Sequence, residues 1–140
     1  MSVYLDASVL VALFSIESFS ARADAAFRGR SIVPNVSDFG AAEFASAISR
    51  KVRVGLLTRP EAIKAFSEFD GWAARMASRV EATPTDIRMA ESSLRRLDLT
   101  LRAPDAINIA IAQRVGAELA TFDRKMADCA RALGVTVAAI

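Results

Sequence analysis

The chain has 140 residues, of which 53% are hydrophobic and 24% charged, so it can bury one core and is expected to form a single domain over residues 1–140. It has no histidine and one cysteine, Cys129, which excludes Ser-His-Asp and Cys-His nucleophiles, histidine-bound metals and zinc fingers. The net charge of +2 permits a nucleic-acid partner without indicating one.

Two features predict a cytoplasmic protein with no membrane segment. A single cysteine cannot form an internal disulfide, which favours a reducing compartment. The apolar run at residues 9–14 is too short to cross a membrane and has no basic leader before it.

The first third of the chain predicts strands that alternate with helices. Residues 2–6 favour a short strand, and residues 7–14 favour a buried helix that follows it directly. A second helix is expected at 17–28, and a short strand at 31–34 closes at a proline.

The middle of the chain predicts a pair of long helices. Asn35 or Ser37 can cap the first, which ends at about Val54. Thr58 and Glu61 have the spacing of a capping box and open the second.

The second half of the chain continues the alternation of strands and helices. A helix that begins at Pro104 and stops at Gly116 is apolar nearly all round and is therefore central. The other expected elements are a strand at 79–82, a helix at 83–97, a strand at 118–122, a helix at 123–133 and a strand at 135–140. Together they predict a three-layer α/β/α fold with about five mostly parallel strands and about seven helices.

Four acidic residues fall where such a fold forms a ligand site. Asp6 and Asp123 end two predicted strands, and Asp105 lies in the first turn of the central helix. Glu43 lies at the border of an apolar stripe, where a charged side chain needs a partner. Ligands of parallel α/β sheets collect beyond the carboxyl ends of the strands, so these acids are expected to meet there.

Each acid also has a simpler explanation. Asp6 and Asp123 are good helix N-caps, Asp105 complements a helix dipole, and Glu43 can pair with an arginine of its own helix. The four together favour a metal site, because clustered carboxylates raise one another's pKa values unless a cation neutralises them. Oxygen ligands without histidine or cysteine select Mg²⁺, with Mn²⁺ as a substitute, and indicate phosphodiester chemistry.

The segments around these acids form an ordered set. They are YLDASVLVALF with Asp6, AAEFASAISRK with Glu43, PDAINIAIA with Asp105 and LATFD with Asp123. Over the whole chain this set resembles the PIN-domain ribonucleases of the VapC toxin type. The resemblance implies a magnesium-dependent endoribonuclease, the toxin of a type II toxin-antitoxin system.

The resemblance also implies roles and partners. The four acids would bind metal and catalyse cleavage, with Ser8 and Thr121 as supporting hydroxyls. The family often has histidine at the position of Asn108, so this chain departs from the pattern there. A homodimer is implied, together with a VapB-type antitoxin and a larger toxin-antitoxin assembly.

The hypothetical mechanism is attack of a metal-bound water on RNA, which leaves 5′-phosphate and 3′-hydroxyl ends. RNA phosphates need cations near the site, and the candidates are Arg50, Lys51, Arg53, Arg59 and Arg102. Most aromatic residues follow core periodicity, and only Trp72 looks spare, more suited to a core or a protein interface than to RNA.

Two other functions remain open. An aspartate phosphatase or receiver also places acids at strand ends, but here Ser8 stands where the phosphatase needs a second aspartate. A PIN-like module that only binds RNA or protein would share the fold, and metal-dependent cleavage would exclude it.

Overall fold

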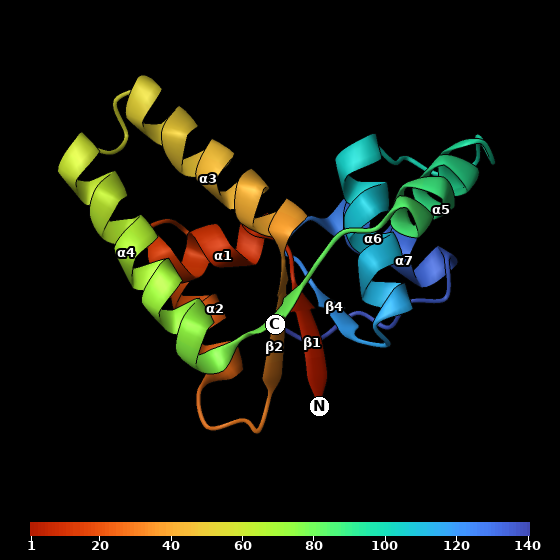
Figure 1. The fold of residues 1–140 in the computed structure, drawn as a ribbon, viewed down its shortest axis with the longest axis horizontal. Coiled ribbons are helices and arrows are strands. Elements are labelled where there is room, and N and C mark those ends of the chain that lie inside the picture. The colour runs from red at the N-terminus through yellow and green to blue at the C-terminus, as the bar shows by residue number, and fades with distance from the viewer.

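Four parallel strands form the centre of the computed structural model, which describes residues 1–140 (Figure 1). The strands are β1 (Ser2–Leu5), β2 (Val33–Ser37), β3 (Ser78–Val80) and β4 (Glu118–Ala120). They lie in the order β3-β2-β1-β4, and all three pairings are parallel.

Seven helices cover the two faces of this sheet. They are α1 (Ala7–Phe14), α2 (Ser20–Phe27), α3 (Asp38–Arg53), α4 (Arg59–Met76), α5 (Pro84–Leu94), α6 (Ala103–Arg114) and α7 (Arg124–Ala132). Figure 1 shows α1 to α4 on one side of the sheet and α5 to α7 on the other, which confirms the predicted three layers. No helix is both long and apolar enough to span a membrane.

Strand β1 separates the two hydrophobic cores. Its side chains alternate between the faces of the sheet, as they do in any strand. Val3 and Leu5 pack in the core beneath α1, α3 and α4, whereas Tyr4 packs in the core beneath α6 and α7. The residue that follows β1, Asp6, therefore lies between the two helix layers.

The sheet differs from the prediction at two strands. The prediction of a fifth strand at 135–140 is wrong, because this segment forms only a single β-bridge, between Val137 and Leu119. Only Leu119 of strand β4 pairs with this segment: its N–H donates to the carbonyl of Thr136, and its carbonyl accepts from the N–H of Ala138, both at 2.8 Å. Strand β2 continues through Pro34 instead of ending there. Proline has no backbone N–H to donate, and none is needed at this position because pairing with β3 begins only at Asn35.

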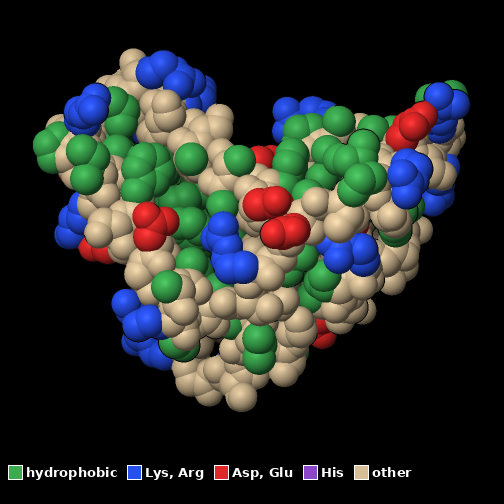
Figure 2. Space-filling model, viewed as in Figure 1, with side chains coloured by type: hydrophobic (Ala, Val, Ile, Leu, Met, Phe, Trp, Pro, Cys, Tyr) green, Lys and Arg blue, Asp and Glu red, His purple; other side chains and the backbone are tan.

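The strand order creates a switch point between β1 and β4. From β1 the chain adds β2 and then β3 on one side, and it returns to the other side of β1 to add β4. In open α/β sheets the loops diverge at such a point and leave a crevice beyond the strand ends. Figure 2 shows a notch between the two groups of helices, with basic side chains at the tips of both lobes.

A buried ion pair joins α5 to α6. Arg114 on α6 donates hydrogen bonds of 2.7 and 3.0 Å to the two carboxylate oxygens of Asp86. Asp86 is fully buried and also accepts a 2.8 Å hydrogen bond from the backbone N–H of Thr83, which closes the capping box of α5. This pair ties α5 to the helix that carries Asp105.

Candidate functional site

Asp6 lies at the carboxyl end of β1, beside the end of β4. Its backbone N–H donates to the carbonyl of Ala120 at 3.2 Å. Its Oδ1 accepts hydrogen bonds from Ser8 Oγ at 2.6 Å and from the backbone N–H of Val9 at 3.2 Å, and its Oδ2 accepts one from Thr121 Oγ1 at 2.5 Å. The side chain is therefore held in one orientation, and it also caps α1.

Burial destabilises the ionised form of Asp6. The residue is only 5% exposed, and this burial raises the pKa of its carboxyl above the ordinary value of 3.8. The hydrogen bonds from Ser8 and Thr121 lower the pKa and oppose that effect. A buried carboxylate of this kind is stabilised by a bound cation.

Asp123 follows β4 and is tied to the same hydroxyl groups. Its backbone N–H donates to Thr121 Oγ1 at 3.0 Å, and the N–H of Phe122 donates to Ser8 Oγ at 3.0 Å. Its Oδ1 accepts from the N–H of Met126 at 3.1 Å and caps α7. Ser8 and Thr121 thus lock the loops after β1 and β4 together.

Glu43 on α3 is held by a chain of hydrogen bonds that crosses the sheet. Asn108 Nδ2 donates to Glu43 Oε1 at 2.6 Å and to the carbonyl of Pro104 at 3.0 Å. Tyr4 Oη donates to Asn108 Oδ1 at 2.5 Å and shares a 2.6 Å hydrogen bond with Ser37. The partner of Glu43 is thus an amide on α6, not an arginine of α3.

Charge repulsion links the four acids. Burial raises the pKa of Glu43, and the negative charges of Asp6 and Asp105 raise it further. Burial also raises the pKa of Asp105, where the guanidinium of Arg102 opposes the shift and the charge of Asp123 adds to it. The structure therefore brings the predicted acids from four separate segments within electrostatic reach of one another.

The donor set fits a hard divalent cation. All the donors are carboxylate oxygens, and Glu43 Oε2, Asp105 Oδ1 and Asp123 Oδ2 accept no hydrogen bond from the protein. No three acidic side chains converge on one point at direct ligand distance. Mg²⁺ keeps several of its waters and needs only one or two direct carboxylate ligands, so the placement suits an ion bound partly through water.

A groove of about 640 Å³ leads away from Asp123 toward basic residues. Ser8 and Asp123 line one part of it, and Arg50 and Lys51 line another. Lys51 is paired with Glu17 at 3.6 Å, whereas Arg50 has no ion pair. The groove gives a polyanion a path to Asp123, the one acid of the four that lines it.

The other predicted cations differ in their placement. Arg102 lies 3.6 Å from Asp105 and is directly at the site. Arg53 donates a 2.9 Å hydrogen bond to Ser49 on the exposed side of α3 and does not line the groove. Arg59 is the first residue of α4 and lies outside the groove as well.

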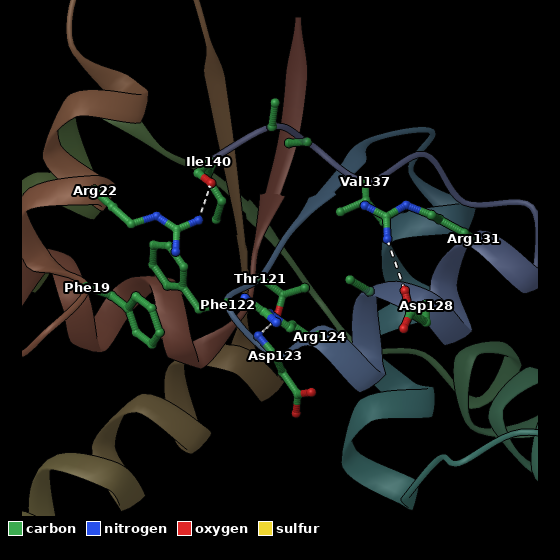
Figure 3. Close-up of a pocket in the computed structure, with 13 residues that line it drawn as sticks. Phe19, Arg22, Thr121, Phe122, Asp123, Arg124, Asp128, Arg131, Val137 and Ile140 are labelled. Carbon is green, nitrogen blue, oxygen red and sulfur yellow. Dashed lines mark hydrogen bonds and ion pairs between the residues drawn. The ribbon is translucent and has the colours of Figure 1, made fainter.

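Sequence reasoning missed an aromatic pair beside the site. Phe19 and Phe122 stack with ring centroids 4.6 Å apart (Figure 3). Trp72, which looked spare, packs against Phe14 at 5.3 Å in the core between α1 and α4. The only available signal was the position of Phe122 next to Asp123, because Phe19 is distant in sequence.

A family model for the PIN domain matches residues 3–132. This chain belongs to the PIN domain family. The acids at the ends of β1 and β4 are thus part of a PIN domain. A search of curated proteins finds no significant match.

Solved structures share this PIN fold. VapC20 of Mycobacterium tuberculosis, described as a sarcin-ricin loop cleaving toxin, is 17% identical with a TM-score of 0.72, over 93% of this chain and 94% of that one. A chain of VapBC2 from Rickettsia felis, bound to a DNA fragment from its promoter, is 13% identical with a TM-score of 0.68, over 98% and 97%. A chain of FitAcB from Neisseria gonorrhoeae is 16% identical with a TM-score of 0.64, over 96% and 95%. The predicted resemblance to VapC-type PIN domains is confirmed in the fold.

Proposed function

We propose that this PIN domain is the toxin of a type II toxin-antitoxin system and a magnesium-dependent endoribonuclease of the cytoplasm. One observation carries the proposal: Asp6 and Asp123 end adjacent strands and are locked together through Ser8 and Thr121. The similarity of fold to VapC20, a toxin described as cleaving the sarcin-ricin loop, supports cleavage of RNA.

Asp6, Glu43, Asp105 and Asp123 would hold Mg²⁺, with Mn²⁺ as a substitute. When bound, the ion supplies a Lewis acid that acidifies a coordinated water and offsets phosphate charge. Ser8 and Thr121 fix the carboxylate of Asp6. Glu43 keeps Oε2 free of hydrogen bonds, so in its ionised form this oxygen can hold the ion or orient a water bound to it.

Cations around the site would bind the RNA backbone. Arg50 and Lys51 line the groove that reaches Asp123, and Arg102 stands beside Asp105. Arg53, at the end of the same helix, would contact phosphates farther along. These contacts position RNA without reading its sequence.

A VapB-type antitoxin is the proposed partner, within a larger assembly built on a homodimer of this chain. The proposal is supported by similar folds in toxin-antitoxin complexes, among them VapBC-1 from nontypeable Haemophilus influenzae and a complex from Klebsiella pneumoniae. A basic antitoxin side chain that enters the acidic cluster would compete with the metal for the carboxylates.

The test is incubation of purified protein with total RNA in Mg²⁺ or in EDTA. We expect cleavage only with the cation, and products with 5′-phosphate and 3′-hydroxyl ends. Asp123→Asn should abolish it, while Glu91→Gln, which neutralises an exposed carboxylate on α5, should not. Cleavage that persists in EDTA, or 2′,3′-cyclic phosphate ends, would contradict the proposal.

The aspartyl-phosphate alternative fits Asp6 poorly. Its carboxylate is 5% exposed and both oxygens accept hydrogen bonds, so it is badly placed to attack a phosphoryl group. A binding module without catalysis is separated from the nuclease by the same cleavage experiment.

A further inference from the structure

A second hollow lies beside Asp123 and borders the same aromatic pair as the groove. It has a volume of about 400 Å³ and is formed by α2, the loop after β4, α7 and the last segment of the chain (Figure 3). None of the four predicted acids except Asp123 lines it. The metal site therefore does not account for this pocket.

One of the three arginines that line the pocket has no partner. Arg131 is paired with Asp128 at 3.2 Å, but Arg124 has no ion pair. Arg22 already has a partner, because it donates a 2.7 Å hydrogen bond to the main-chain oxygen of Ile140. The carboxylate of Asp123 points away from Arg22 and Ile140 (Figure 3). Arg124 is thus the arginine of the pocket that is free to bind a phosphate.

The aromatic pair gives the pocket a stacking surface. The rings of Phe19 and Phe122 are nearly parallel, with an interplanar angle of 5°. The guanidinium of Arg22 lies 5.5 and 5.3 Å from the two ring centroids, and Phe19 remains 36% exposed. Aromatic rings beside arginines are the usual platform for unpaired bases.

The pocket and the groove share a wall. Phe19, Phe122 and Asp123 line both hollows. A single strand that enters along Arg50 and reaches Asp123 can therefore continue over the aromatic pair into the pocket. Asp123 lies where the groove meets the pocket.

We propose that this pocket binds the nucleotide next to the cleaved bond, with its unpaired base stacked on Phe19 and its phosphate held by Arg124. The inference rests on the proposed ribonuclease function and names its substrate class, single-stranded RNA. Duplex RNA is a poor ligand, because its bases are already stacked and cannot reach the rings.

Binding is tested without catalysis, using a fluorescein-labelled single-stranded RNA of mixed sequence in EDTA. Phe19→Leu keeps an apolar side chain but removes the stack, and we expect binding at least about fivefold weaker. Arg124→Gln should weaken binding and lower the slope of log affinity against log salt by about 1. The matched control is Arg88→Gln, which removes an equal charge from α5 and should change nothing.

The outcomes separate the pocket from the nuclease. If the wild type binds RNA through these residues but does not cleave it, the proposed function fails and the pocket stands. If the wild type cleaves RNA while Phe19→Leu and Arg124→Gln bind it as tightly as the wild type, the pocket proposal is overturned. Equal losses with a duplex probe, or with Arg88→Gln, also overturn it.

Discussion

Asp6 has two roles at once, as a helix cap and as the most buried acid of the candidate site. Its Oδ1 caps α1 through the N–H of Val9, yet burial raises the pKa of the same carboxyl. Asparagine is as good an N-cap as aspartate and carries no charge. The two roles can therefore be separated by one substitution.

Asp6→Asn should abolish RNA cleavage and leave the metal-free protein at least as stable as the wild type. The substitution removes a buried charge but keeps the cap. Cleavage assays and thermal unfolding in EDTA check this expectation. A sharply lower melting temperature with intact cleavage would show that Asp6 is only a cap.

Asn108 controls the ionisation of Glu43. Its hydrogen bond to Oε1 lowers the pKa of Glu43, so Asn108→Ala should raise that pKa further. Because Glu43 acts in its ionised form, the acid limb of the rate profile should move to higher pH. The measurement is kcat/KM against pH, with exposed Gln113→Ala on the same helix as control; coincident profiles would contradict the assignment.

At the scale of elements, the pair of α5 and α6 positions Asp105. The buried ion pair between Asp86 and Arg114 is the strongest polar link between these helices. Arg114 lowers the pKa of Asp86, so the stabilisation that this pair provides is complete above the ordinary value of 3.8 and is lost as the pH falls through the lower folded value.

Asp86→Ala should lower the free energy of unfolding by about 2–4 kcal/mol, because it leaves a guanidinium without its partner and removes a cap. Urea unfolding at neutral pH measures this. Asp128→Ala breaks an exposed pair with Arg131 and should cost less than about 1 kcal/mol. Equal effects of the two substitutions would contradict this account of the buried pair.

Local sequence signals predicted the helices better than the strands. The capping box of Thr58 and Glu61 and the start at Thr83 are both confirmed. Strand β3 has only three residues and the segment at 135–140 is reduced to one bridge, because pairing depends on neighbours that local patterns do not reveal. For the same reason the strand predicted at 31–34 differs from β2, which spans Val33–Ser37 and includes Pro34.

At the scale of the whole molecule, the strand order unites the acids. Pairing of β1 with β4 brings Asp6 to the loop of Asp123, although 117 positions separate them in the sequence. From the sequence, Asp6 and Asp123 could be expected to lie close together only if the strands that precede them are neighbours in the sheet. The link from Tyr4 through Asn108 to Glu43 was beyond prediction, because it joins three elements across the sheet.

The metal-free protein should lose stability as the pH rises above the ordinary carboxyl values of 3.8 for aspartate and 4.5 for glutamate. The pKa values of Asp6, Glu43 and Asp105 are raised by folding, so the unfolded chain ionises first and is favoured in that range. Thermal unfolding in EDTA across this range measures the effect. Mg²⁺ should reverse this loss of stability, and the double variant Asp6→Asn, Asp105→Asn should show a smaller dependence of stability on pH. An unchanged dependence in the double variant would contradict the account.

The central claim is that Asp6, Glu43, Asp105 and Asp123 share one divalent cation site. Anomalous diffraction from crystals grown with Mn²⁺ tests it directly. We expect an anomalous peak among these four side chains, and no such peak in crystals of Asp6→Asn. A peak elsewhere on the molecule, with the four acids empty at saturating Mn²⁺, would contradict the claim.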